Sequence, residues 1–179
     1  MNDAPHAGQQ PFDARDFRNA LGTFATGVTV VTTCAGDGRL IGLTCNSFSS
    51  VSLTPPLILW SLSMYSPNLQ VFLRARHFAV NVLAHDQIEL ARRFSQAVEE
   101  RFAGVDCSFG EDGIPLIANA LAHLECRNEA RHYSGDHAIL IGNVLRYAYR
   151  DVAPLVFHRG HYTALRDLPD APEPPKGLL

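Results

Sequence analysis

The residues best suited to chemistry gather between positions 42 and 56, where the chain carries hydroxyl groups and an amide but no charge. Thr44, Asn46 and Ser47 lie in this segment, which ends at Pro55 and Pro56 and contains no Asp, Glu, Lys or Arg. An exposed strand normally carries charged side chains, and a core strand carries few polar ones. Neutral donors and acceptors in such number suit a large, polar, planar ligand. We therefore predict that this segment lines a ligand site.

A second group of polar residues follows a strand-like apolar run. Its members are Ser61, Ser63, Ser66 and Asn68. Serine as an N-cap, followed by Pro67 at the first helical position, predicts that a helix begins here. The unpaired amides of a helix N-terminus attract anions, so these hydroxyls and the amides of Asn68 and Leu69 are candidates for holding a phosphate. The alternative is that Ser66 serves only as the helix cap.

A third candidate is His137, which follows Gly135 and Asp136 and begins a long apolar run. An imidazole can donate or accept a hydrogen bond near neutral pH, so this side chain could orient a bound ligand. The alternative is a structural histidine at the start of a strand.

The last candidates lie in residues 154–162. His158 and His161 have a spacing found in some metal pairs, but no third histidine or carboxylate accompanies them at a short interval, so no metal site is predicted. Arg159 has a planar guanidinium that suits phosphate oxygens. Tyr162 is placed either to stack on a ligand or only to pack.

Composition narrows the class of protein. A chain of 179 residues with 46% hydrophobic and 18% charged residues fits one domain that folds unaided. The formal net charge of −3 does not indicate the basic surface that binds nucleic acid or an anionic membrane. No apolar run reaches the roughly 18 residues of a bilayer span, and the first residues lack a secretion signal. We expect a cytoplasmic protein with a small-molecule partner, and neither nucleic acid nor a membrane.

Lysine and cysteine usage exclude further chemistry. Lysine occurs only as Lys176, so neither a Schiff-base lysine nor a P-loop lysine is available. The cysteines form no C-x-x-C pair, which argues against a zinc site and a disulfide framework, and we expect them to be buried small hydrophobes. They are Cys34, Cys45, Cys107 and Cys126. Cys45 has no cation near it in sequence to activate its thiol.

The elements expected to position these residues are mostly strands. They are predicted at 27–33, 39–44, 47–52, 57–62, 77–83, 120–131, 137–149 and 155–165. Gly36, Asp37 and Gly38 form a predicted hairpin turn. Helices are expected to begin at Asp13, Ser66 and Asp86, the first with an apolar face that packs on the domain.

Antiparallel strands with short turns predict a mainly β fold with peripheral helices, arranged as a closed barrel. The folded domain is expected to cover residues 13–165. Residues 1–12 and the Pro-rich residues 166–179 are expected to be disordered.

The polar segment also carries a family resemblance. Its pattern is Gly42-x-Thr44-x-Asn46-Ser47-Phe48-x-Ser50-Val51-Ser52-Leu53-x-Pro55-Pro56, which resembles the signature of the short-chain flavin reductases. The Gly135-Asp136-His137 segment and the run from Pro154 to Tyr162 resemble two further segments of that family. The resemblance implies the FMN-binding split barrel, a Greek-key antiparallel β-barrel that forms a homodimer with flavin near the subunit interface.

The resemblance also implies roles for single residues in the polar segment and beside it. Thr44, Asn46 and Ser47 would line the isoalloxazine ring and ribityl chain, with Cys45 contributing mainly backbone. The serine group from Ser61 to Asn68 would hold the flavin phosphate. Arg92 and Arg93 are further phosphate candidates, or are simply solvated.

Other implied roles concern the helix end and the later motifs. Phe94 and Ser95 resemble the family's helix end near the flavin, although Phe94 could equally be core. His137 would orient the nicotinamide without abstracting a proton. Arg159 would contact the pyrophosphate of NADH.

The resulting hypothesis is an NAD(P)H:flavin oxidoreductase. It would pass a hydride from NADH or NADPH to FMN or FAD and deliver reduced flavin to a separate oxygenase component. One alternative is a non-catalytic flavin-binding protein on the same barrel. The other is an FMN oxidase of the pyridoxamine-phosphate type, which expects a more basic substrate pocket than a chain with one lysine indicates.

Overall fold

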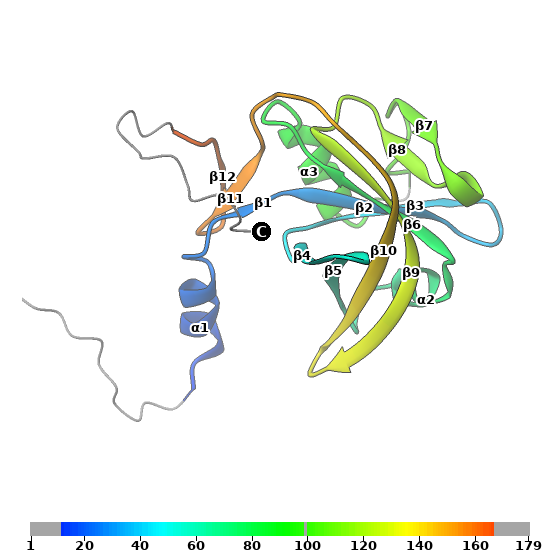
Figure 1. Ribbon diagram of the computed structural model, residues 1–179. Coiled ribbons are helices and arrows are strands. Elements are labelled where there is room, and N and C mark those ends of the chain that lie inside the picture. Colours follow the sequence, from blue (N-terminus) through cyan, green and yellow to red (C-terminus); the bar gives the residue numbers. More distant parts are fainter. Residues whose placement is uncertain (1–11, 99, 167–179) are drawn as a thin grey trace, which may run out of the picture.

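The computed structural model describes residues 12–98 and 100–166 (Figure 1). The termini predicted to be disordered, 1–12 and 166–179, lie outside the described residues except for Phe12 and Arg166. Within the described part of the chain, no helix has the length and apolar character needed to span a membrane.

A seven-stranded antiparallel sheet forms the body of the molecule, with strand order β3-β2-β6-β9-β10-β5-β4. Its strands are β2 (Thr29–Cys34), β3 (Leu40–Cys45), β4 (Ser49–Leu53), β5 (Pro56–Ser63), β6 (His77–Val82), β9 (Ala122–Ser134) and β10 (His137–Tyr149). β2 and β3 are joined through the predicted turn, where Gly38 has φ +86°. The predicted mainly β, antiparallel architecture is therefore confirmed.

The remaining elements are short. A three-stranded sheet contains β1 (Thr26–Gly27), β11 (Val156–His158) and β12 (His161–Thr163). A two-stranded sheet contains β7 (Cys107–Phe109) and β8 (Pro115–Ile117). The helical elements are α1 (Ala14–Leu21), α2 (Leu69–Arg74), α3 (Ile88–Ser95) and η1 (Glu111–Gly113).

The sheet must curl because its two edge strands are consecutive in the chain. β3 ends at Cys45 and β4 begins at Ser49, and this link spans at most about 14 Å when extended. The edges of a flat seven-stranded sheet would lie about 28 Å apart at the usual strand spacing. The linker, which belongs to the polar segment found in the sequence, therefore brings the end of β3 close to the start of β4. The two edge strands do not pair with each other, as in a split barrel.

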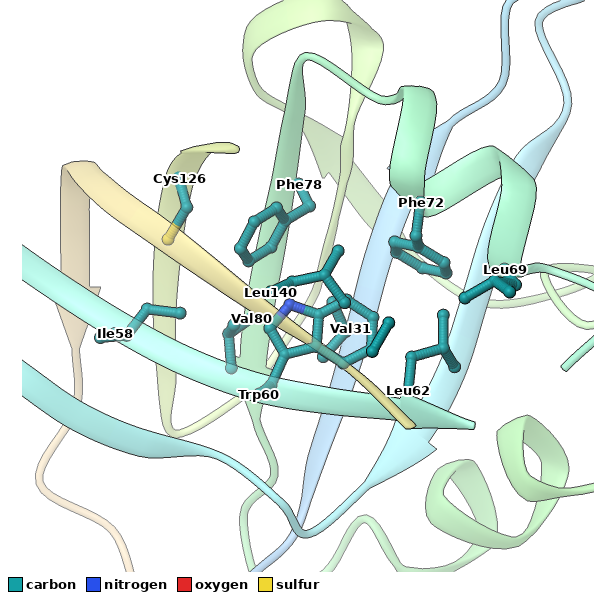
Figure 2. Packing of buried hydrophobic residues seen from close by; sticks show 11 residues of the cluster. Val31, Ile58, Trp60, Leu62, Leu69, Phe72, Phe78, Val80, Cys126 and Leu140 are labelled. Carbon is teal, nitrogen blue, oxygen red and sulfur yellow. The ribbon is translucent and has the colours of Figure 1, made fainter. Parts of the chain in front are cut away.

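The barrel interior is filled by large apolar side chains. Trp60 lies at the centre, with its ring centroid 5.0 Å from that of Phe72 and 5.9 Å from that of Phe78 (Figure 2). Ile58 and Leu62 point into the same core from β5. Because successive strand residues face opposite sides, Ser61 and Ser63 lie on the other face of β5. Because Ile58, Trp60 and Leu62 are buried in the barrel, Ser61 and Ser63 point away from its interior.

A second cluster packs α3 against the other face of β2. It contains Val28, Val30, Leu83, Ala91 and Phe94, all nearly inaccessible to solvent. Val31, the next residue after Val30, belongs to the barrel interior instead. β2 is therefore buried on both faces, which agrees with its uncharged sequence of mostly β-branched residues.

The structure corrects three predicted elements. α1 is capped by Asp13 as predicted, but its apolar residues Phe17 and Leu21 are exposed and the helix stands apart from the sheet (Figure 1). α2 begins at Leu69 with Asn68 as N-cap, not Ser66. The run 155–165 is a hairpin, β11–β12, because the chain reverses at Arg159 and Gly160 with positive φ.

Candidate functional site

A cavity of about 510 Å³ lies at the seam where the two edges of the sheet meet. It collects residues from β3, the following linker, β5, the start of α2, the end of α3 and the start of β10. Most of the predicted site residues line it, the exceptions being Arg92, Arg93, Arg159 and Tyr162. Those that line it are Thr44, Cys45, Asn46, Ser47, Ser61, Ser63, Ser66, Asn68, Phe94, Ser95 and His137. Apart from the Cys45 thiol, the only described lining residues that can carry charge are Arg101 and His137.

Strand pairing brings the distant parts of this set together. His137 lies opposite Ser63 in the β10–β5 ladder, and Ile139 lies opposite Ser61. The Ser47 hydroxyl accepts a hydrogen bond from the Ser61 amide at 2.9 Å and donates one to the Ser61 carbonyl at 3.0 Å. The linker is therefore held against β5 by a side chain acting as a strand partner.

The polar wall offers a ligand fewer donors than its sequence indicates. The Thr44 hydroxyl donates to the Ala91 carbonyl at 2.7 Å and ties β3 to α3, while the Ser47 hydroxyl hydrogen is used on Ser61. These two oxygens retain acceptor lone pairs. The exposed Asn46 side chain makes no hydrogen bond within the described residues and keeps both donors and acceptor. The wall thus offers the hydroxyl oxygens of Thr44 and Ser47 as acceptors, and the Asn46 amide as both donor and acceptor.

Cys45 is anchored between these residues. Its carbonyl accepts from the Thr29 hydroxyl at 2.9 Å, and its sulfur lies 3.2 Å from the same hydroxyl. Burial raises the pKa of the Cys45 thiol. The thiol is therefore neutral at physiological pH and is not poised as a nucleophile.

The anion end of the cavity differs from the prediction. The Asn68 amide donates to the Ser66 hydroxyl oxygen at 3.3 Å, and the Leu69 amide donates to the Ser66 carbonyl at 3.1 Å. The expectation that these two amides are free for a phosphate is therefore wrong. The Ser66 hydroxyl hydrogen and the Asn68 side chain remain available, since Asn68 makes no side-chain cap bond.

Arg101 supplies a positive charge at the same end and was missed in the sequence. Its Nη1 donates to the Gly42 carbonyl at 2.8 Å, and its Nε donates to the Gln96 carbonyl at 2.9 Å. A guanidinium has five N–H groups, so three remain for a ligand. Two backbone carbonyls fix the group without neutralising it, which suits it to phosphate. No sequence motif marks it, because its anchors are backbone atoms of other segments.

Arg92 and Arg93, named from the sequence as phosphate candidates or as solvated residues, face away from the cavity. Arg92 pairs with Glu89 at 2.6 Å on the exposed side of α3. Arg93 donates to the Ala103 carbonyl at 2.7 Å. Neither lines the cavity.

Phe94 is both core and cavity wall. It is 1% exposed, and its ring centroid lies 4.9 Å from that of Phe102. A Cβ placed on Gly42 would lie 2.7 Å from the Phe94 ring, so only glycine allows this approach of α3 to β3. The Ser95 hydroxyl donates to the Arg92 carbonyl at 2.7 Å and finishes the helix. Both readings of Phe94 are therefore compatible with its position.

His137 has a defined hydrogen-bonding state. Its Nδ1 lies 2.7 Å from Oδ1 of Asp136, and this hydrogen bond lowers the pKa of Asp136. An ionised carboxylate can only accept, so Nδ1 carries the hydrogen and Nε2 is the acceptor in the neutral ring. The side chain is 46% exposed and lines the cavity. It can accept from an amide of a ligand bound there.

Arg159 and Tyr162 lie outside this cavity. Arg159 sits in the β11–β12 turn and lines a separate cavity with residues of α1, including Asp16 and Asn19. Tyr162 packs on Phe157 with ring centroids 5.5 Å apart, and burial raises the pKa of its phenol. Within one chain, neither side chain joins the residues around His137.

Comparison with known proteins gives a family match and several similar relatives. Residues 21–166 match the model described as Flavin reductase like domain. The chain is 48% identical over 150 residues to FMN reductase (NADH) SmoA of Agrobacterium fabrum, covering 84% of this chain and 85% of the relative. It is 38% identical over 166 residues to the flavin-dependent monooxygenase reductase subunit HsaB of Rhodococcus jostii, covering 92% and 85%.

Solved structures agree with the sequence matches. The NADH:FAD oxidoreductase SgcE6 of Streptomyces globisporus superposes with a TM-score of 0.84 at 36% identity, covering 92% of this chain and 100% of that chain. Some other relatives are about twice as long, and the chain spans about half of their length. The matched residues include the whole cavity lining, and the chain belongs to the flavin reductase like domain family.

Proposed function

We propose that this protein is an NADH-dependent flavin reductase that delivers reduced FMN or FAD to a separate oxygenase component. The observation that carries the proposal is the cavity at the barrel seam. It is lined by an uncharged polar wall, by Arg101 bound to the Gly42 carbonyl and by His137, whose Nδ1 is bound to Asp136. A volume of about 510 Å³ is sufficient for a small-molecule site.

The donor set fits a flavin mononucleotide unit. The uncharged wall of Thr44, Asn46 and Ser61 suits a neutral ring with carbonyl and imide groups. Arg101, with Ser66 and Asn68, suits a phosphate at the other end. A flavin held by these residues would supply the hydride acceptor, and a reduced nicotinamide would supply the hydride, so the redox chemistry would belong to the two cofactors.

The protein's part in this reaction is to bind and orient. Asn46 can donate to a ring carbonyl, and the fixed oxygens of Thr44 and Ser47 can accept from hydroxyl or imide groups. His137 Nε2 can accept from the carboxamide of the nicotinamide. No acid or base is required, which agrees with a cavity whose described lining holds no carboxylate.

The oxidase alternative is less well supported by this cavity. A phosphorylated substrate bound beside a phosphorylated cofactor would require a second set of cationic groups. In the described lining, Arg101 is the only permanently charged group. A non-catalytic flavin carrier would bind no nicotinamide. His137 offers a hydrogen-bond acceptor for such a second ligand, which favours the enzyme over the carrier.

The test is anaerobic mixing of the purified protein with NADH and FMN or FAD. We expect the visible absorbance of oxidised flavin to fall many times faster than in a control without protein. A rate equal to the control would contradict the enzymatic proposal. Retention of flavin without turnover would favour the carrier.

The oxygenase component and the release of flavin to it are also proposals. The HsaB relative is named as a reductase subunit of a monooxygenase, which supports a separate partner. If reduced flavin is released, the protein should lose its flavin during gel filtration and reduce excess free flavin over many turnovers. Tight retention of one flavin per chain would contradict delivery by diffusion.

A cytoplasmic location, where NADH is abundant, stays a prediction.

A homodimer is proposed from the apolar surface of the α1 region. Phe17 and Leu21 of α1, with Phe12 before the helix and Phe24 after it, are between 47% and 77% exposed. Exposed apolar area of this kind costs about 25 cal/mol per Å² relative to burial. A second copy of the chain would cover it, and analytical ultracentrifugation should give twice the chain mass. A monomer at micromolar concentration would contradict this.

A further inference from the structure

A second cavity lies apart from the candidate site, at the carboxyl end of α2. It has a volume of about 540 Å³ and is bounded by the β2–β3 turn, by α2 with the residues that follow it, and by η1. It shares no described lining residue with the seam cavity. In Figure 1 these elements lie on the side of the sheet away from α1, the surface proposed to bind a second copy.

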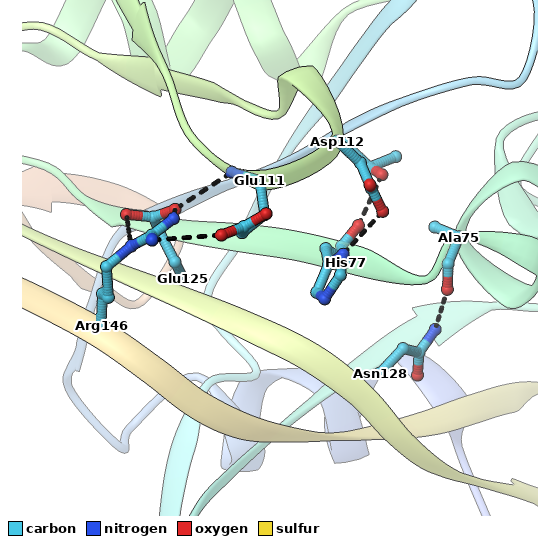
Figure 3. A network of polar contacts seen from close by, with 8 residues as sticks. Ala75, His77, Glu111, Asp112, Glu125, Asn128 and Arg146 are labelled. Carbon is cyan, nitrogen blue, oxygen red and sulfur yellow. Dashed lines mark hydrogen bonds and ion pairs between the residues drawn. The ribbon is translucent and has the colours of Figure 1, made fainter.

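Positive charge outweighs negative charge in this cavity. Three of its described lining residues are arginines, namely Arg39, Arg74 and Arg76. Its two aspartates already have partners within the chain. Asp37 accepts from Nε of Arg39 at 2.7 Å. Asp112 lies 2.6 Å from Nδ1 of His77, which donates to it (Figure 3).

Most of the guanidinium donors in the cavity remain available. Arg39 uses only Nε on Asp37, so its two terminal nitrogens keep four N–H groups. Among the described residues, neither Arg74 nor Arg76 is paired with a carboxylate. A guanidinium binds a carboxylate or phosphate through two parallel hydrogen bonds. The cavity therefore offers three such groups to an anion.

Hydrogen bonds fix the backbone that carries two of these arginines. Asn128 of β9 donates from Nδ2 to the Ala75 carbonyl at 3.1 Å and from its backbone amide to the Arg76 carbonyl at 2.9 Å (Figure 3). On the other side of the cavity, Asp37 accepts from both Nε and the backbone amide of Arg39. Since the backbone is already ordered, a ligand has to order only side chains, which reduces the entropic cost of binding.

The uncharged part of the lining limits the kind of ligand. Most of it is made of small residues, namely Cys34, Ala35, Gly36, Val71 and Ala75. The described lining contains no aromatic ring, so a flat base would have nothing to stack on. A short carbon chain or a bare phosphate chain fits beside such residues. The cavity is thus better matched to a compact anion than to a nucleotide.

We propose that this cavity binds a small polyanion with two or three carboxylate or phosphate groups, held by Arg39, Arg74 and Arg76. Each acidic group can pair with one guanidinium, so a ligand with several such groups uses more of the donors than a simple monoanion. The inference does not depend on the proposed function, because no lining residue of the seam cavity takes part.

The experiment is isothermal titration calorimetry of the purified protein without added flavin. Citrate and pyrophosphate are titrated in separate arms, and acetate serves as the monoanion. We expect at least one polyanion to bind at one site per chain with a Kd of about 100 µM or lower at low ionic strength. Acetate should bind more than about tenfold more weakly. The tighter arm identifies carboxylate or phosphate as the preferred group, and binding of neither would overturn the proposal.

Arg74→Ala and Arg76→Ala test the contacts one at a time. Both side chains are exposed, so their removal leaves the fold intact, which circular dichroism checks. Each variant should raise the Kd for the polyanion about tenfold, as for one charge-assisted hydrogen bond. An unchanged Kd in both variants would contradict the proposed site.

Arg127→Ala is the matched control, because it removes the same charge from an exposed arginine outside the cavity. Arg127 pairs with Glu129 at 2.8 Å and does not line the cavity. Its Kd for the polyanion should equal that of the wild type. A loss as large as in the two test variants would mean that overall charge attracts the anion, and the inference would be wrong.

Competition separates this cavity from the seam cavity. We expect saturating FMN or NADH to leave polyanion binding unchanged, and Arg101→Met to keep the wild-type affinity, because Arg101 lines the seam cavity and not this one. Displacement by FMN, FAD or NADH would place the anion at a nucleotide site and overturn the inference, even if the protein reduces flavin. If the polyanion binds through Arg74 and Arg76 but no flavin is reduced, the inference stands and the proposed function fails.

Discussion

Ser47 and Ser61 are joined by a pair of hydrogen bonds in which one side chain replaces a strand. The Ser47 hydroxyl accepts from the Ser61 amide at 2.9 Å and donates to the Ser61 carbonyl at 3.0 Å. β4 starts only at Ser49, so without this contact the β5 edge would have unpaired backbone groups beside the cavity. The residue that closes the seam therefore also shapes the wall of the site.

Replacement of Ser47 by alanine should loosen this seam. We expect a loss of about 1–2 kcal/mol in the free energy of unfolding, because a partly buried amide and carbonyl lose their partner. The Kd for FMN should rise as the linker moves. Urea denaturation and flavin titration measure the two effects. Ser50→Ala, on exposed β4, is the control, and equal behaviour of the two variants would contradict the role given to Ser47.

Replacement of Gly42 by alanine should push α3 away from β3. The new Cβ would lie 2.7 Å from the ring of Phe94 and 3.1 Å from that of Phe102. Overpacking of this kind costs about 1–3 kcal/mol. Flavin affinity should fall too, since the Gly42 carbonyl anchors Arg101. Gly36→Ala, where a Cβ meets nothing within 4 Å, should leave both stability and affinity unchanged.

Replacement of Arg101 by methionine should act on the phosphate and not on the ring. A charge-assisted hydrogen bond is worth about 1.5–3 kcal/mol, so the Kd for FMN should rise about 10-fold to 100-fold. Riboflavin has no phosphate, and its Kd should change much less. The comparison of the two ligands in one titration series decides the point. An equal loss for both would mean that Arg101 only supports the fold.

Replacement of His137 by alanine should weaken the nicotinamide and spare the flavin. With Nδ1 bound to Asp136, the ring offers Nε2 as acceptor, and its loss should raise the KM for NADH about fivefold to tenfold, as for one hydrogen bond. The Kd for FMN should stay the same. His132→Ala, on exposed β9, is the control. An unchanged KM for NADH would exclude the proposed contact.

The acid stability of the fold should depend on Glu125. Arg146 binds both carboxylate oxygens of Glu125, at 3.1 and 2.8 Å, and reaches Glu111 at 3.2 Å (Figure 3). The hydrogen bonds from Arg146 hold the pKa of Glu125 below its usual value of 4.5. A group whose pKa is lowered by folding stabilises the native state above its unfolded pKa, and that stabilisation is lost as pH falls.

The measurement is chemical denaturation between neutral pH and strong acid. We expect the wild type to lose stability progressively below about pH 4.5. Glu125→Gln should start from a lower stability at neutral pH and show a flatter profile in acid. Parallel profiles for the two proteins would show that Glu125 does not contribute to the acid response.

Much of the site could be predicted because it follows from local pattern. The neutral segment around Asn46 and the alternation of Trp60, Ser61 and Leu62 are properties of consecutive residues. Asn46 and Ser61 line the cavity, and burial along β5 alternates as expected. Arg101 could not be found in this way, because backbone carbonyls of Gly42 and Gln96 select it and these contacts exist only in the folded chain.

Two errors concern competition between local and tertiary forces. Ser66 has the sequence of a helix cap, but its hydroxyl and carbonyl accept from the next amides in a turn, and the helix begins only at Leu69. α1 has an apolar face that a sequence rule assigns to the core of the same chain. Its exposure on Phe17 and Leu21 shows that amphipathicity does not specify which surface is covered.

The most direct test is a crystal structure of the protein soaked with FMN. The account predicts that the isoalloxazine ring contacts Thr44, Asn46 and Ser61 at the barrel seam and that the phosphate lies within hydrogen-bond distance of Arg101. Flavin bound instead between α1 and the β11–β12 turn, with the seam cavity filled by protein side chains, would contradict it.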